Sequence, residues 1–243
     1  MRQSATPLSF FNRNKPGKGT HDMGYFRMLA GRLRSSLNKI LGWQSDTLED
    51  RTTQMRKLHA DLDIDVGSFQ KKCGFECLQS CGHCCENPMV EATELEMLPL
   101  AQALIDEDKA DQWYLAAEKQ DFSGRCVFFQ PEPRPGARGH CGAYANRPLV
   151  CRLFNCSCVM DKLNRPRLVV CAPVKAVYPG QVARAQVAIT SGKLRAPGMA
   201  DYTMRAMAVD LELERERFPI NMAFKRAVDR VWIHQRFSPD LSP

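Results

Sequence analysis

Apolar side chains recur at steps of three and four residues in several parts of this chain. Near the N-terminus the series is Phe26, Leu29, Leu33, Leu37 and Ile40, with basic residues between its members. This spacing gathers the apolar residues on one face and predicts a basic amphipathic helix. Two stretches near the C-terminus, 199–215 and 221–237, are also typical of helices.

A further helix start is predicted in the middle of the chain, at Thr93. Thr93 and Glu96 fit a capping box, in which the Thr hydroxyl accepts a backbone N–H and the Glu side chain reaches back. Leu95 and Leu98 then begin an apolar face. Pro99 lacks an N–H, so we expect it to end or kink this first piece and to open a second helical piece.

The segment 108–119 predicts another helix that carries Trp113, Tyr114 and Leu115, and its two aromatic residues are expected in the core rather than at a cofactor. The run 130–142 is rich in Pro and Gly and predicts a loop. Together these patterns predict a mainly α fold with irregular, metal-stapled loops and a small cysteine-rich core flanked by helices. We divide the chain into a basic arm with its helix (1–66), a cysteine-cluster domain (67–175) and a C-terminal helical segment (176–243).

The positive charge is concentrated in the arm. Residues 1–45 contain eight Lys or Arg and one acid, Asp22, a net charge of +7, and the whole chain also carries +7, so residues 46–243 are neutral. Such a helix can dock on its own protein or on a protein partner, lie on an anionic membrane, touch nucleic acid or serve as a transit peptide. We expect docking first and nucleic acid last, because no nucleic-acid recognition motif accompanies the charge.

All eleven cysteines lie between Cys73 and Cys171. The N-terminus has no apolar signal-peptide region, and no later run is long enough to cross a membrane, so we expect a reducing, cytoplasmic location. Disulfides are disfavoured there, the count is odd, and the adjacent Cys84 and Cys85 cannot readily pair with each other. Dense cysteines in a reducing compartment indicate metal binding or redox chemistry. Side chains of neighbouring residues tend to diverge, so we expect Cys84 and Cys85 to serve different centres or one larger cluster.

Four sequence features carry a resemblance to a known family. They are "CLQSCGHCC" (77–85), "CVFFQ" (126–130), "GHCGAYANRPLVCRLF" (139–154) and the later Cys171. This pattern resembles the YkgJ-type cysteine-cluster family, a zinc- or iron-chelating domain, over about 77–171. The resemblance implies eight metal ligands, enough for two four-ligand centres: Cys77, Cys81, Cys84, Cys85, Cys126, Cys141, Cys151 and Cys171.

Three cysteines fall outside this ligand set, Cys73, Cys156 and Cys158, and we expect their replacement by Ala to be tolerated. Cys156 or Cys158 remains an alternative to Cys171 as the last ligand.

The arginines of the motif, Arg147 and Arg152, are expected to neutralise the centre and to donate to sulfur or to a carboxylate, or else to form ordinary surface ion pairs. His83 and His140 adjoin ligand candidates, and histidine can bind zinc. Because the resemblance assigns the cysteines, we expect both histidines to act as donors beside the centre, with ligation by either as the alternative.

Thiolate ligation suits both zinc and iron. The adjacent Cys84 and Cys85, with the nearby arginines, favour an iron–sulfur cluster of the 4Fe–4S type over zinc.

We expect a metal-binding protein with a structural or electron-carrying centre. The alternative is an iron–sulfur enzyme resembling flagellin lysine N-methylase, although the chain has no convincing glycine-rich motif for a methyl-donor nucleotide. Thiol redox catalysis at Cys81 and Cys84 is a third option. The sequence identifies no catalytic residue, and whether the protein is an enzyme stays open.

Overall fold

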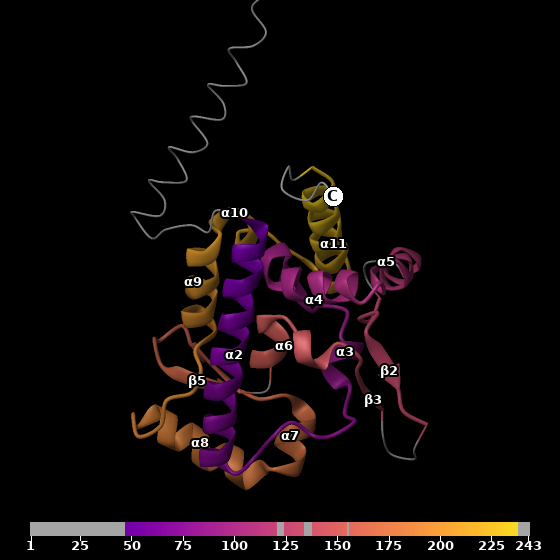
Figure 1. Ribbon diagram of the computed structural model, residues 1–243. Coiled ribbons are helices and arrows are strands. Elements are labelled where there is room, and N and C mark those ends of the chain that lie inside the picture. Colours follow the sequence, from indigo (N-terminus) through magenta and orange to yellow (C-terminus); the bar gives the residue numbers. More distant parts are fainter. Residues whose placement is uncertain (1–46, 121–123, 134–137, 155, 238–243) are drawn as a thin grey trace, which may run out of the picture. The chain divides into compact units, whose positions relative to one another are not determined.

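The longest helix of the computed structural model, α2 (Leu48–Cys73), is the element against which many others pack (Figure 1). The structure describes residues 47–120, 124–133, 138–154 and 156–237. The predicted basic helix over 26–40 lies outside these residues, and its docking on a protein partner stays a prediction. Residues 66 and 67, where the sequence suggested a domain boundary, both lie inside α2.

Local sequence explains both ends of α2. The Thr47 hydroxyl accepts a hydrogen bond from Asp50 N at 3.0 Å, and Gly74 ends the helix in the left-handed conformation at φ 69°. Glycine adopts this conformation without the penalty that a Cβ brings. The buried face of α2 includes Met55, Leu58 and Leu62.

The main hydrophobic core lies where α4 (Glu94–Asp106) packs against α2 and α11 (Ile220–Phe237). Thr93 caps α4 as predicted, accepting from Glu96 N at 3.0 Å. The expected break at Pro99 is wrong, because α4 continues as one helix through it. The Glu96 carboxylate does not complete a capping box. It is buried and accepts a hydrogen bond from Val150 N at 3.3 Å.

Helix α5 (Ala110–Lys119) confirms the helix predicted over 108–119. Its Trp113 ring lies 5.0 Å from the ring of Phe128, and its Tyr114 ring lies 5.2 Å from that of Trp232. Leu115 of the same helix faces away from this packing and is 52 % exposed.

Each of the sheets in the described residues is a pair of short antiparallel strands. β1 (Glu91–Thr93) pairs with β6 (Arg217–Pro219), with Ala92 opposite Phe218. β2 (Phe129–Pro131) pairs with β3 (Gly139–Cys141), with Gln130 opposite His140. β4 (Ser157–Met160) pairs with β5 (Pro166–Val169), with Cys158 opposite Leu168. The run 130–142 was expected to be a loop, but both of its ends are strands, because each finds backbone partners on the other.

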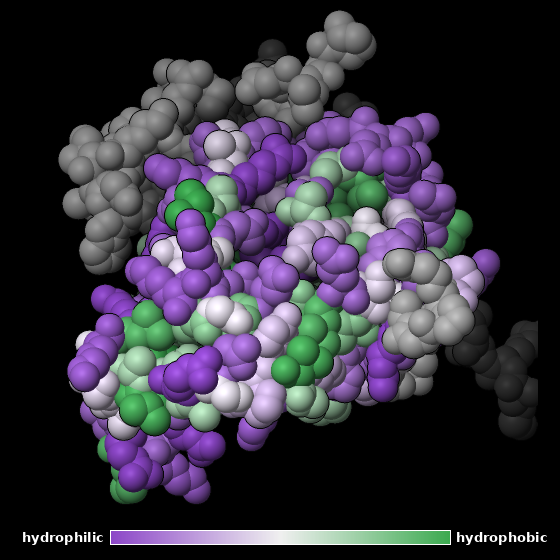
Figure 2. Space-filling view, turned by 90° about the horizontal axis from the view of Figure 1, so that it is seen from below, coloured by the Kyte–Doolittle hydropathy of each residue, from purple (hydrophilic) through white to green (hydrophobic). Residues whose placement is uncertain are grey.

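A second hydrophobic cluster lies where the C-terminal end of α2 meets α8 (Pro179–Thr190) and α7 (Ala172–Val177). Its buried members include Phe69, Phe75 and Cys156. Seen from the end where α7 and α8 lie, hydrophobic side chains form separate patches between hydrophilic ones (Figure 2).

The remaining helices are α3 (His83–Glu86), α6 (Leu149–Leu153), α9 (Met199–Val209) and α10 (Leu211–Glu214), with a 3₁₀ turn, η1 (Tyr144–Asn146). The helices predicted over 199–215 and 221–237 correspond to α9, α10 and α11. The mainly helical fold is therefore confirmed. Among the described helices, none combines the length and the apolar composition that crossing a bilayer requires.

Candidate metal centre

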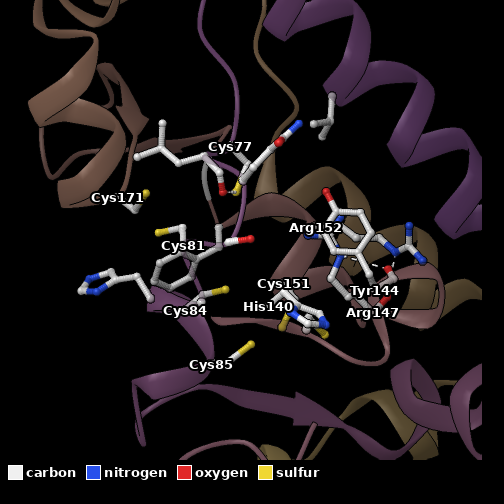
Figure 3. A pocket seen from close by; sticks show the side chains of 18 of the residues that line it. Cys77, Cys81, Cys84, Cys85, His140, Tyr144, Arg147, Cys151, Arg152 and Cys171 are labelled. Carbon is white, nitrogen blue, oxygen red and sulfur yellow. Dashed lines mark hydrogen bonds between the residues drawn. The ribbon is translucent and has the colours of Figure 1, made fainter. Parts of the chain in front are cut away.

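Cysteines from distant parts of the chain line one cavity of about 610 Å³. Seven of the eight cysteines predicted as ligands contribute to its wall: Cys77, Cys81, Cys84, Cys85, Cys141, Cys151 and Cys171. In Figure 3, Cys81, Cys84 and Cys171 lie on one side of this cavity, and Tyr144 and Arg147 lie on the other. The eighth cysteine, Cys126, is buried next to Cys85.

The first cysteine loop is folded tightly by two residues with positive φ, Ser80 at 50° and Gly82 at 57°. A Cβ at Gly82 would lie 2.5 Å from Phe129 Cε2 and 3.0 Å from Gly139 O, so only glycine fits under the β2–β3 hairpin. The hairpin holds the loop in return, because the Gly139 N–H donates to Ser80 O at 3.2 Å. Helix α3 follows directly and carries Cys84 and Cys85.

Cys85 is the centre of an inner group of thiols. Hydrogen bonding with the thiols of Cys126, Cys141 and Cys84, in that order of importance, raises the pKa of Cys85 far above its usual value. The same contact with Cys85 lowers the pKa of Cys84 to about 6 and also lowers the pKa of Cys141. The expectation that Cys84 and Cys85 serve different centres or one larger cluster stays a prediction.

Cys151 completes the inner group from helix α6. Desolvation, followed by the nearby thiol of Cys126, raises the pKa of Cys151 well above its usual value, although the residue as a whole is only half-buried. The Glu96 carboxylate holds the N-terminus of α6 in place by accepting the Val150 N–H. Burial raises the pKa of Glu96 to about 6.

Cys126 is held by helix α11, a part of the chain outside the predicted cysteine domain. The side-chain oxygen of Asn221 accepts the Val127 N–H at 3.0 Å, and its Nδ2 donates to Arg125 O at 3.1 Å. Asn221 is buried, so these bonds are shielded from water. A backbone bond from Cys126 N to Cys85 O at 3.0 Å then joins two predicted ligands. The sequence contained no signal for this role of Asn221, because its partners lie more than 90 residues away.

Arg152 stabilises the backbone that lines the cavity. Its Nε donates to Arg147 O at 2.7 Å, its Nη2 donates to Ala145 O at 2.5 Å, and its Nη1 forms an ion pair with Asp63 of α2. All three nitrogens are therefore occupied by oxygen acceptors. Arg152 fixes the backbone of the turn before Cys151, and no donation from it to a sulfur is found among the described residues.

Arg147 lines the same cavity as the thiols. Its guanidinium stacks on the Tyr144 ring, 3.6 Å from the ring centroid, and its Nε donates to Tyr144 O at 3.1 Å. After the contact with Cys85, the positive charge of Arg147 contributes to lowering the pKa values of the Cys84 and Cys141 thiols. A cation beside thiols favours their thiolate form, which is the form that binds metal.

Cys77, Cys81 and Cys171 form an outer group at the wall of the same cavity. The residue Cys77 is exposed, but desolvation of its thiol by surrounding atoms raises its pKa to about 11. Desolvation also raises the pKa of Cys171. Metal binding at these positions has to displace the thiol protons, because both thiols are protonated at neutral pH without metal.

The three cysteines predicted to be outside the ligand set belong to the second hydrophobic cluster. Cys156 is fully buried there and accepts a hydrogen bond from Gln70 Nε2 at 3.3 Å. Cys73 and Cys158 pack against the same cluster, and Cys171 touches it from the cavity side. None of Cys73, Cys156 and Cys158 is among the described residues that line the thiol cavity.

Both histidines beside the cysteines line the cavity as well. His140 Nδ1 lies 4.0 Å from Glu132 Oε2. His83 Nδ1 is buried and has no hydrogen-bond partner in the described part of the chain. The expected donation from either histidine to a cysteine is not observed among these residues.

The donor set fits a thiophilic metal, since it consists of soft sulfur ligands next to a cation. Within the described residues, no three or more His, Cys, Asp or Glu side chains are already arranged around a single metal-ion position. The inner thiols lie close enough to shift one another's pKa values, and metal binding would have to displace their remaining protons. Zinc or an iron–sulfur cluster would be held by the cavity cysteines and Cys126, with Arg147 balancing part of the charge.

A comparison with protein-family models matches residues 76–172 of this chain. No curated protein and no solved structure matches the chain. The matched span starts one residue before Cys77 and ends one residue after Cys171, so it contains every cysteine predicted as a ligand. Residues 76–172 therefore match the CxxCxxCC family model, which is described as a "Putative zinc- or iron-chelating domain".

Proposed function

We propose that the CxxCxxCC domain holds an iron–sulfur cluster of the 4Fe–4S type through cysteine thiolates and that this centre is structural or carries electrons. The observation that supports the proposal is the gathering of cysteines from separate segments of the chain at one cavity next to Arg147. The proposed ligands are the eight cysteines of the family pattern.

This gathering is costly for a protein without a metal. Ordering the segments that carry the cysteines costs conformational entropy, and a buried polar group requires a partner. Parts of these segments, Cys85 and Cys126 among them, pack into the main hydrophobic core, and this packing offsets part of the cost. Metal–thiolate bonds offset the cost, because metal binding contributes directly to folding free energy.

Two features favour iron–sulfur over a single zinc ion. A structural zinc ion takes four ligands, whereas the inner group alone has five thiols: Cys84, Cys85, Cys126, Cys141 and Cys151. The cavity of about 610 Å³ also has space for the eight-atom core of a four-iron cluster. The five inner and three outer thiols suit one large cluster or two centres. The described residues give no specific support to the alternative function, methyl transfer.

Metal analysis of the protein purified without oxygen tests the proposal. We expect iron and acid-labile sulfide in equal amounts, together with a broad visible absorption band. Zinc in a colourless sample would contradict the iron–sulfur assignment but would agree with thiolate ligation. Protein that folds fully without iron or zinc would contradict both.

A further inference from the structure

Arg147 is held rigidly at both its backbone and its side chain. Its carbonyl oxygen accepts the Nε–H of the buried Arg152 at 2.7 Å. Its own Nε donates to Tyr144 O at 3.1 Å, and its guanidinium stacks on the Tyr144 ring at 3.6 Å. These contacts cost the side chain most of its rotamer freedom before any ligand arrives, which reduces the entropy lost on binding.

Arg147 and Arg152 differ in their ionic partners. Asp63, which lines the same cavity, is paired with Arg152. Arg147 forms no ion pair among the described residues, and its two terminal nitrogens donate no hydrogen bond there. A guanidinium presents paired N–H donors whose geometry matches a carboxylate or a phosphate.

The cavity volume of about 610 Å³ leaves space beside a single four-iron core, which contains eight atoms. The volume falls in the range of small-molecule sites, which combine apolar walls with a few polar groups. Val66 and Leu78 supply apolar wall, and Gln79 and His140 supply polar groups.

We propose that the open part of this cavity binds a small molecule with a carboxylate or phosphate group and that Arg147 holds this anionic group beside the metal centre. The inference rests on the proposed metal centre for the location of the ligand. The thiolates of the metal centre compete with the small molecule for Arg147. The guanidinium has two terminal nitrogens, however, and it lines a cavity with space for a ligand.

The test uses the metal-loaded protein, after its iron, sulfide and zinc contents have been measured. Inorganic pyrophosphate and succinate serve as phosphate and carboxylate probes, and binding is followed by titration calorimetry at constant ionic strength. We expect saturable binding of at least one probe, and the better probe identifies the anionic group. Arg147→Gln should weaken this binding at least about tenfold, because charge-assisted hydrogen bonds are lost.

Two further variants keep the test decisive. Arg195→Gln is the control, because Arg195 is an arginine with an 87 % exposed side chain outside the cavity, and we expect unchanged binding. Arg147→Lys keeps the positive charge beside the thiols but not the paired donors, so we expect retained metal and weaker probe binding. If Arg147→Gln loses its metal, the probe affinity of Arg147→Lys is compared with that of the wild type instead. No saturable binding by the metal-loaded wild type, or equal binding by Arg147→Lys, overturns the inference and leaves the metal centre intact.

Discussion

Cysteines lie in two neighbouring regions of this protein and have different roles in the two. In the cavity, thiols from several segments contact one another and lie near Arg147. In the second hydrophobic cluster, Cys156 is surrounded by apolar side chains such as Phe69, Phe75 and Val174. Cysteine is thus a candidate metal ligand in the first region and a small apolar residue in the second. The nearby cation Arg147 distinguishes the cavity, because Cys156 also lies near other thiols, those of Cys77, Cys73 and Cys171.

The largest expected effect comes from Cys85→Ala. Cys85 contacts three other thiols, so its loss removes the centre of the inner group. Structural zinc contributes about 10–16 kcal/mol in small peptides, and removing one ligand should forfeit several kcal/mol of that order. We expect metal content to fall below half of the wild-type value, measured by elemental analysis, with a lower thermal midpoint. Cys158→Ala is the matched control, and equal metal loss in both variants would contradict the division into two regions.

The second effect concerns the backbone under the cavity. Arg152→Met removes three hydrogen-bond donations and leaves the carbonyl groups of Ala145 and Arg147 without their donor. We expect a loss of roughly 3 kcal/mol in unfolding free energy, measured in urea, together with reduced metal content. Asp63→Asn should cost under about 1 kcal/mol, because Asp63 is half exposed. A larger cost for Asp63→Asn would show that the ion pair matters more than the carbonyl bonds.

The third prediction is a pH dependence. Glu214 is buried, receives a hydrogen bond from Thr93 and lies with Glu96 near Arg217. Burial, and then the charge of Glu96, raises the pKa of Glu214 to about 8 from an unperturbed 4.5. The folded protein therefore binds the proton more tightly than the unfolded chain, and this stabilisation is complete below pH 4.5 and is lost as pH rises through 8.

Between pH 6 and 8 we expect the unfolding free energy to fall by about 1 kcal/mol per pH unit in the wild type. Glu214→Gln cannot titrate and should show a shallower slope in the same urea titrations. An equal or steeper slope in Glu214→Gln would mean that Glu214 is ionised in the folded protein across this range.

The fourth effect tests whether helix α11 belongs to the site. Asn221→Ala removes the partners of Val127 N and Arg125 O, on both sides of Cys126. We expect a loss of about 1–2 kcal/mol in stability. We also expect an altered electronic absorption spectrum of the metal centre, because Cys126 is displaced. Gln235→Ala, at an exposed amide on the same helix, should change neither. An unchanged spectrum in Asn221→Ala would limit Asn221 to a purely stabilising role.

The smallest effect is expected in the second hydrophobic cluster. Cys156→Ala removes one buried sulfur and its bond from Gln70. We expect about 1 kcal/mol of destabilisation and full metal content. Loss of metal in Cys156→Ala, with Cys171→Ala unaffected, would exchange these two residues in the proposed ligand set.

The sequence was informative where the determinants are local. Thr93 and its helix follow from four consecutive residues, and the cysteine pattern is contained in short motifs. The roles of Asn221 and Glu96 were not predictable, because their partners are 94 and 54 residues away and neither residue type reveals a distant backbone contact. Helix α2 was missed because many charged residues lie between its buried positions, and about three-quarters of it (48–66) falls within the predicted arm. Pro99 was misjudged because tertiary burial on all sides outweighs one missing hydrogen bond.

X-ray absorption at the metal edge of the anaerobically purified protein tests the central claim most directly, because it reports the atoms bound to the metal. We predict sulfur neighbours at about 2.3 Å, the distance typical of metal–thiolate bonds. For iron, a second shell of metal neighbours should accompany them. A first shell dominated by nitrogen or oxygen would contradict thiolate ligation by the cavity cysteines, whichever metal is present.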